Sequence, residues 1–105
     1  MSEGLDKLFA TIAARKDADP GQSYTAKLLA AGVEKCAKKF GEEATETVIA
    51  AISRDKTELA KESADVLYHL AVLWAASGIT PEDVYKVLKE REAMSGLEEK
   101  TSRKS

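Results

Sequence analysis

The stretch KFGEEATETVIAAISRDKTELAKESADVLYHLAVLW, residues 39 to 74, decides the fold, because it predicts two helices joined by a tight turn. Arg54-Asp55 interrupts the helical pattern near its middle. Asp55 is a favourable N-cap, and Glu58 three residues later completes a capping-box pattern for the second helix. If the chain reverses there, the two helices run antiparallel and lie side by side.

Two carboxylate pairs with the same spacing occupy this hairpin, Glu43-x-x-Glu46 and Glu62-x-x-Asp65. A spacing of three places both members of a pair on one face of a helix. The first pair is centred about ten residues before the turn and the second about nine after it, so both lie roughly 14 Å from the turn. We therefore expect the four carboxylates to converge on one small volume, which requires a cation.

The donor type favours Mg²⁺, with Mn²⁺ as a substitute. A single Glu-x-x-Glu more often marks a solvated acidic face, but two pairs at matched height are less easily explained in that way. All four groups are oxygen donors, which favours Mg²⁺ over zinc. A di-iron bundle would need Glu-x-x-His pairs, whereas positions 46 and 65 are Glu and Asp. Mg²⁺ held by carboxylates keeps coordination positions for water and phosphate; the number of ions is left open.

Composition excludes several classes of function. The chain has 105 residues, enough for one domain, and a net charge of −2, so no basic field is present to attract nucleic acid. The longest apolar run, residues 64 to 76, is too short to span a bilayer, and no signal peptide is expected. Cys36, the single cysteine, falls on an apolar stripe and is predicted to be a buried structural thiol. We expect a cytoplasmic protein.

Helical periodicity extends over nearly the whole chain, and no strand pattern is found. A turn signal at Pro20-Gly21 and the Thr80-Pro81 start of the last helix separate the predicted segments. These observations predict one all-α domain over residues 1–95, followed by a flexible polar tail at 96–105. The expected helices cover residues 4–16, 24–31, 33–53, 56–77 and 81 to about 94.

The fourth predicted helix indicates an oligomer. From residue 66 to residue 76 it reads VLYHLAVLWAA, which is apolar nearly all round and must be covered on every side. We expect the few other helices of the chain to be too small for this, so the hairpins of two subunits would form a four-helix bundle across a homodimer. Assembly beyond the dimer is left open. His69 borders the carboxylate side, and a hydrogen-bonded structural histidine is favoured over a catalytic one.

The motifs resemble a known superfamily and, more narrowly, one of its families. Glu42-Glu43-x-x-Glu46 followed by Glu62-x-x-Asp65 resembles the signature of the MazG-like all-α nucleotide pyrophosphatases. Three segments, SYTA at 23–26, KFGEEATE at 39–46 and ADVLYHL at 64–70, are similar to the phosphoribosyl-ATP pyrophosphohydrolase family. The resemblance extends over about residues 5 to 91, and the four acidic positions all match.

This resemblance implies Mg²⁺-dependent hydrolysis of phosphoribosyl-ATP to phosphoribosyl-AMP and pyrophosphate, the second step of histidine biosynthesis. It implies metal ligation and catalysis by the four paired carboxylates, whereas Glu42 is left open between an outer-sphere role, a base and a solvated side chain. Lys39 lies one turn before the first pair and is the best local candidate for a phosphate contact. The expected residues are, for catalysis, Glu42, Glu43, Glu46, Glu62 and Asp65, of which the last four bind metal, and, for substrate, Lys39, Tyr24, Thr25 and Arg91.

Two other functions fit the same pattern. A housekeeping pyrophosphatase for non-standard nucleoside triphosphates would keep the chemistry and change the substrate. A non-catalytic helical dimerisation module with a salt-bridged acidic face would need no metal. Mg²⁺-dependent thermal stability and a comparison of substrates distinguish these alternatives.

Overall fold

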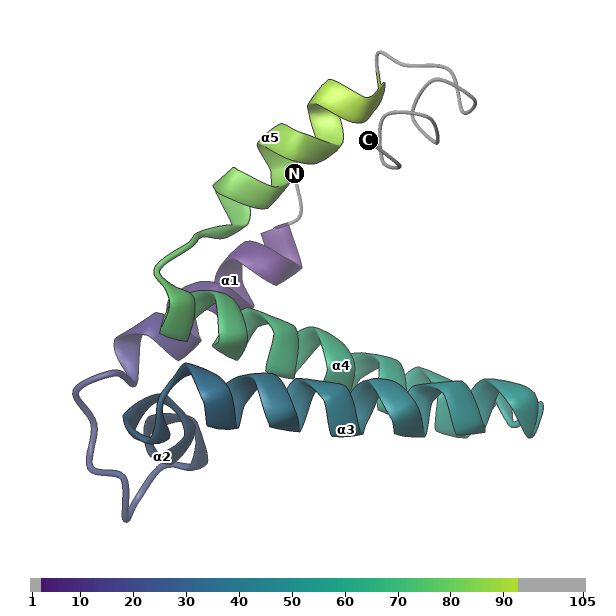
Figure 1. Cartoon of the computed structure of the whole chain (residues 1–105), viewed down its shortest axis with the longest axis horizontal. Coiled ribbons are helices and arrows are strands. Elements are labelled where there is room, and N and C mark those ends of the chain that lie inside the picture. The colour runs from purple at the N-terminus through teal and green to yellow at the C-terminus, as the bar shows by residue number, and fades with distance from the viewer. Residues whose placement is uncertain (1–2, 93–105) are drawn as a thin grey trace.

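The computed structural model describes residues 3–92, which form helices and contain no strand (Figure 1). This confirms the predicted all-α class. The expected polar tail at 96–105 lies outside the described residues, as does the predicted end of the last helix. The helices are α1 (Glu3–Ala14), α2 (Tyr24–Ala31), α3 (Val33–Ile52), α4 (Lys56–Ser77) and α5 (Pro81–Glu92).

Local capping signals define the helix limits that the sequence predicted. The Asp55 carboxylate accepts a hydrogen bond from the Glu58 amide at 3.0 Å, which starts α4 as expected. Arg54, with φ at 60°, supplies the left-handed residue that reverses the chain between α3 and α4. Gly78, with φ at 78°, ends α4, and a side chain there would be strained.

The first helix is shorter than predicted. The expected range was 4–16, whereas α1 ends at Ala14. The next two amides, of Arg15 and Lys16, bond to the carbonyls of Ile12 and Ala13, three residues back. Such bonds tighten the end of a helix into a turn, so α1 closes before the predicted position.

The α3–α4 hairpin is the frame of the molecule, and α1 and α2 cover only one end of it. The two long helices lie antiparallel along their length (Figure 1). The buried core gathers where α1 and α2 pack on the first half of α3 and the second half of α4. Cys36 is buried there as predicted, and its thiol donates to the Leu28 carbonyl at 3.2 Å. The core residues are Ile12, Leu28, Cys36, Ala71 and Val72.

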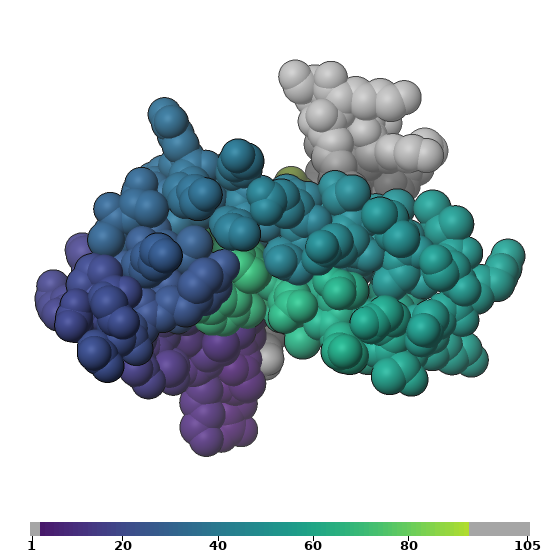
Figure 2. Space-filling model, turned by 90° about the horizontal axis from the view of Figure 1, so that it is seen from below, coloured from purple at the N-terminus to yellow at the C-terminus, as the bar shows by residue number. Residues whose placement is uncertain are grey.

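The other end of the hairpin has no such cover. Figure 2 shows the turn end of α3 and α4, in teal, extending beyond α1 and α2. Three large aliphatic side chains of α3 are exposed there: Val48 by 56%, Ile49 by 58% and Ile52 by 75%. Their spacing of three and four places them on one face of the helix. We call these three residues the apolar end patch.

The apolar run of α4, residues 66–76, is only partly covered by its own chain, and Leu67 stays 49% exposed. Ala71, Val72 and Trp74 are all buried in the single chain. The reason is that α1, α2 and α3 all pack against α4. Within residues 3–92, no helix has the combination of length and hydropathy that crossing a membrane requires.

Candidate active site

The hairpin brings three of the four predicted metal ligands into one cluster. Glu43 comes from α3, and Glu62 and Asp65 come from the facing turns of α4. One carboxylate oxygen from each lies within 4.8 Å of the other two. This separation is short enough for one cation to contact all three, and the donors are oxygens, which suit Mg²⁺. We call these three residues the carboxylate cluster.

Two oxygens of the carboxylate cluster are buried without a partner. Oε2 of Glu43 and Oε2 of Glu62 are shielded from solvent and have no hydrogen-bond donor among the described residues. Buried polar atoms in folded proteins are nearly always paired, because an unpaired one costs free energy. A cation bound between them would supply the missing partner for both oxygens. The cluster therefore fits a divalent metal ion.

The electrostatics of the cluster agree with this interpretation. Burial raises the pKa of the Glu43 carboxyl, the adjacent Glu46 raises it further, and His69 opposes the shift. Burial also raises the pKa of Glu62, with Glu46 and Asp65 as the next largest causes. Like charges held this close favour protonation unless a cation compensates them. Glu46 is thus the main charged neighbour of both residues, although it lies outside the group of three, and its ligand role stays a prediction.

Thr47 fixes the register of the two helices beside the cluster, which the sequence interpretation did not anticipate. Its hydroxyl lies 2.8 Å from the Glu43 carbonyl on its own helix and 3.2 Å from the Glu62 carbonyl on α4. The first contact is the common back-bond of a helical threonine, which gives no hint of the second. The single hydroxyl proton is shared between the two carbonyls, so Thr47 links the backbones of Glu43 and Glu62.

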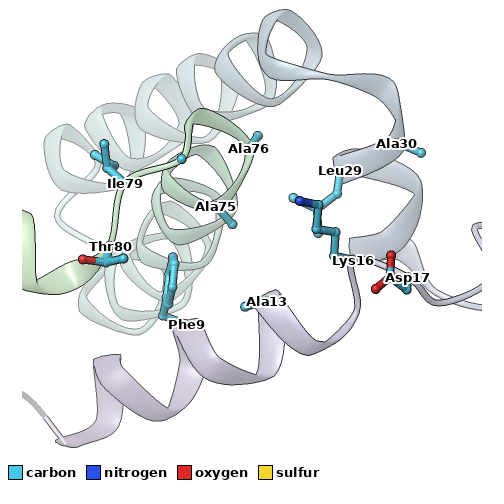
Figure 3. A pocket seen from close by; sticks show the side chains of 11 residues that line it. Phe9, Ala13, Lys16, Asp17, Leu29, Ala30, Ala75, Ala76, Ile79 and Thr80 are labelled. Atoms are coloured by element: carbon cyan, nitrogen blue, oxygen red, sulfur yellow. The ribbon is translucent and has the colours of Figure 1, made fainter.

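A groove next to the cluster gives access from solvent. It has a volume of about 320 Å³ and is lined from α3 by Glu46 and Ile49 and from α4 by Glu58 and Glu62. A second cavity, of about 510 Å³, lies elsewhere, between α1, α2 and the end of α4 (Figure 3). Its lining contains none of the predicted site residues. The groove beside the carboxylates is therefore the better candidate for a charged substrate.

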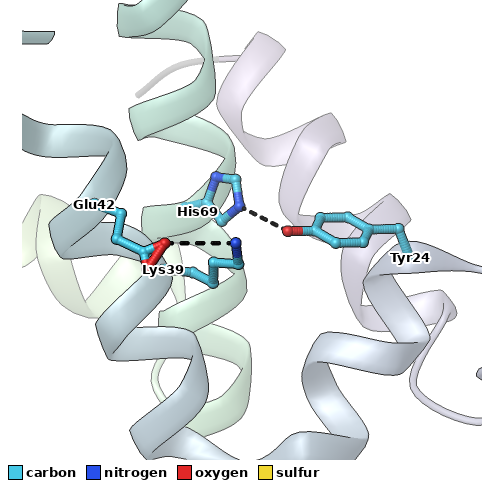
Figure 4. A network of polar contacts seen from close by, with 4 residues as sticks. All are labelled: Tyr24, Lys39, Glu42 and His69. Atoms are coloured by element: carbon cyan, nitrogen blue, oxygen red, sulfur yellow. Dashed lines mark hydrogen bonds and ion pairs between the residues drawn. The ribbon is translucent and has the colours of Figure 1, made fainter. Parts of the chain in front are cut away.

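Lys39 and Glu42 form an ion pair on the same part of α3. The Lys39 ammonium lies 3.5 Å from a Glu42 carboxylate oxygen, and both side chains are partly exposed. An exposed pair of this kind contributes little to stability, so Lys39 can exchange Glu42 for another anion. Figure 4 draws this pair together with Tyr24 and His69, where α2, α3 and α4 meet. His69 is buried and hydrogen-bonded, as the sequence favoured.

The remaining predicted substrate residues occupy two different places. Tyr24 and Thr25 begin α2, and their side chains reach residues of α4 next to the cluster. Arg91 is exposed in the last turn of α5, which packs mainly against α1. Within this chain, the structure thus brings the start of α2 to the carboxylates but not Arg91. The roles of all three residues stay predictions.

Comparison with known proteins identifies the family. The model of the phosphoribosyl-ATP pyrophosphohydrolase family matches residues 5–92. The chain belongs to this family. It is 63% identical over 99 residues to the phosphoribosyl-ATP pyrophosphatase of Parvibaculum lavamentivorans, covering 94% of this chain and 91% of that relative. The proteins of the same name from Azospirillum brasilense and Paracoccus denitrificans are 57% and 58% identical, covering 96% of this chain and 91% and 94% of theirs.

Membership in the family confirms the resemblance drawn from the sequence. It confirms the predicted enzyme class, a hydrolase acting on phosphoribosyl-ATP in histidine biosynthesis. The names of the family and of its relatives support this activity over the two alternatives, a housekeeping pyrophosphatase and a non-catalytic dimerisation module. The Mg²⁺ requirement, the individual residue roles, the homodimer and the cytoplasmic location stay predictions.

Proposed function

We propose that the chain cleaves phosphoribosyl-ATP between the α and β phosphates at the carboxylate cluster, with Mg²⁺ held by Glu43, Glu62 and Asp65 and supported by Glu46. The observation that carries this proposal is the pair of buried, unpartnered oxygens on Glu43 and Glu62. A polyphosphate would be repelled by uncompensated carboxylates, so the site needs a cation before it can accept substrate. Mg²⁺ is the metal best matched to an all-oxygen donor set that also binds phosphate.

The protein groups around the cluster have distinct tasks in this reaction. Mg²⁺, when bound, supplies positive charge that offsets the charge of the polyphosphate. Lys39 exchanges its contact with Glu42 for a phosphate oxygen and stabilises the charge that develops there. The Glu42 carboxylate is then available to accept the proton of the attacking water. Attack on phosphorus breaks the α–β anhydride bond, and pyrophosphate leaves intact.

Product analysis tests this proposal. Phosphoribosyl-ATP is incubated with the protein in Mg²⁺ or in EDTA, and the products are followed by phosphorus NMR. We expect phosphoribosyl-AMP and pyrophosphate in Mg²⁺ and negligible turnover in EDTA. Orthophosphate as the first product, or equal turnover in EDTA, would contradict the proposal. Faster turnover of free nucleoside triphosphates than of phosphoribosyl-ATP would favour the housekeeping function instead.

We also propose that the chain works as a homodimer through the uncovered end of its hairpin. The apolar end patch exposes three large aliphatic side chains on one helical face. Contiguous exposed apolar surface of this kind usually marks an interface. A second hairpin packed on this patch would complete a four-helix bundle. Ile49 belongs to the patch and also lines the groove, so the two are adjacent. A partner bound to the patch would therefore lie next to the carboxylates.

Sedimentation velocity tests the dimer at micromolar concentration. The wild-type chain should sediment as a dimer, and Ile49→Glu should sediment as a folded monomer, because the side chain is exposed in the single chain but buried in the dimer. Lys35→Glu is the control, an exposed position on the same helix outside the patch. A monomeric wild-type chain, or an Ile49→Glu variant that remains dimeric, would refute this interface.

A further inference from the structure

Two neighbouring residues of α2 are bound to two neighbouring residues of α4. The Thr25 hydroxyl makes a hydrogen bond with the Tyr68 hydroxyl. Next to it, the Tyr24 hydroxyl lies 3.5 Å from Nε2 of His69 (Figure 4). The positions paired in this way are 43 and 45 residues apart in the chain. These two contacts therefore fix how the start of α2 lies against α4, beyond the packing of the apolar core.

His69 connects this contact to the carboxylate cluster. Its Nδ1 lies 2.9 Å from the backbone carbonyl of Asp65, one turn earlier on α4. A carbonyl only accepts, so Nδ1 carries a proton, and Nε2 is left to make the contact with the Tyr24 hydroxyl. The start of α2 is thus placed one helical turn from Asp65. Any movement of α2 changes the position of Tyr24 and Thr25 relative to the carboxylates.

Tyr68 supports both of these α2 residues. Tyr24 is 52% exposed, and its ring lies nearly parallel to the Tyr68 ring, at 21°, with centroids 6.4 Å apart. Tyr68 is itself only half-buried, and its hydroxyl is occupied by Thr25. One side chain therefore lies beside an exposed aromatic ring and also holds the hydroxyl of the next residue.

We infer that Tyr68 is a positioning residue for substrate binding, acting through Thr25 and Tyr24 rather than by touching substrate. This inference depends on the proposed function and on the expectation, implied by the family resemblance, that Tyr24 and Thr25 contact phosphoribosyl-ATP bound at the carboxylates. The Tyr68 hydroxyl holds Thr25 in the orientation that the bound substrate meets, and its ring limits the movement of Tyr24. Its loss weakens substrate binding and leaves the carboxylates and the chemical step in place.

Steady-state kinetics with phosphoribosyl-ATP at saturating Mg²⁺ test this role. Tyr68→Phe removes only the hydroxyl, and we expect KM to rise about threefold to tenfold, the range for one lost hydrogen bond, while kcat stays within about twofold. Thr25→Val should raise KM at least as much. Thr25→Ser keeps the hydroxyl and should have a KM close to that of the wild type. Because Tyr68 acts through Thr25, the double variant should match Thr25→Val alone.

Tyr85→Phe is the matched control. The Tyr85 hydroxyl also joins two helices, donating to the Asp6 carboxylate at 3.0 Å, but it lies between α5 and α1. Its loss should lower Tm as Tyr68→Phe does and leave KM unchanged. An unchanged KM in Tyr68→Phe, or additive effects in the double variant, would overturn the inference. Absence of wild-type turnover would instead contradict the proposed function, so the two failures are distinguishable.

Discussion

The carboxylate cluster and the contact between α2 and α4 lie one helical turn apart, yet they satisfy their polar groups differently. In the cluster, Glu43 and Glu62 each bury an oxygen that has no donor within the described residues. In the α2–α4 contact, the hydroxyls of Thr25 and Tyr68 bind each other, and His69 has a partner at both ring nitrogens. The first arrangement is complete only with a ligand, whereas the second is complete in the protein alone.

The difference indicates which residues act on a ligand and which hold the site in shape. Buried unpaired carboxylates decrease stability, and the free energy is regained when a cation binds. Satisfied hydrogen bonds increase stability and gain nothing from the cation. Substitutions in the two regions should therefore change stability in opposite directions and should affect different steps of the reaction.

The largest expected effect is loss of activity on substitution in the cluster. Glu62→Gln keeps the size of the side chain but removes its charge, so we expect turnover of phosphoribosyl-ATP to fall about hundredfold or more. Glu34→Gln, an exposed acid at the start of α3, is the control and should keep wild-type turnover. Turnover of Glu62→Gln within threefold of the wild type at limiting Mg²⁺ would show that this carboxylate does not hold the metal.

The next effect is stabilisation by metal. Mg²⁺ that binds only the folded chain should stabilise it by about 2.7 kcal/mol at a concentration hundredfold above its Kd. Thermal unfolding with and without Mg²⁺ measures this gain as an increase in Tm. Tyr68→Phe should keep the gain in full, and Glu62→Gln should lose most of it. An equal increase in both variants would place the metal outside the cluster.

A smaller effect concerns the free energy of unfolding of the metal-free protein, which the two substitutions Tyr68→Phe and Glu62→Gln should change in opposite directions. Tyr68→Phe removes a satisfied hydrogen bond and should lower the free energy of unfolding by about 1 kcal/mol. Glu62→Gln removes one of several crowded negative charges and should raise it. Urea unfolding in EDTA measures both changes. A destabilised Glu62→Gln variant would mean that the carboxylate has a protein partner and that the contrast between the two regions is wrong.

The smallest effect is the pH dependence of the stability that Glu62→Gln gains over the wild type in metal-free protein. The pKa of Glu62 is raised above its ordinary value of 4.5, so the folded chain holds this proton more tightly than the unfolded chain does. The metal-free wild-type chain therefore becomes more stable relative to Glu62→Gln as the pH falls toward 4.5, because protonation removes the unfavourable charge. The difference in unfolding free energy between the two should narrow from pH about 7 to about 5. If the difference in unfolding free energy instead widens as the pH falls, the pKa of Glu62 is lowered in the folded chain rather than raised.

The hairpin could be predicted from the sequence because its signals are local. Asp55 with Glu58 starts α4, and the left-handed Gly78 ends it, whatever the rest of the chain does. The convergence of the carboxylates followed from their equal distance to the turn and the fixed rise of a helix. The resemblance to the family motifs independently indicated the same acidic residues.

What could not be predicted depends on contacts between distant segments. The pairing of Thr25 with Tyr68 depends on how α2 lies across α4, which no local spacing encodes. How much of the apolar α4 run is covered depends on where α1 packs, and the homodimer expected from that run stays a prediction. The apolar end patch on α3 is a further exposed surface that supports a dimer. The second contact of Thr47 likewise appears only when both helices are in place.

The most direct test of the central claim is a titration of metal-free protein with Mn²⁺, in which electron paramagnetic resonance reports the free ion. The account predicts saturable binding to the wild-type chain, displacement by excess Mg²⁺, and binding weakened at least about tenfold in Glu62→Gln but unchanged in Tyr68→Phe. Equal Mn²⁺ affinity in the wild-type chain and Glu62→Gln would show that the carboxylate cluster is not the metal site.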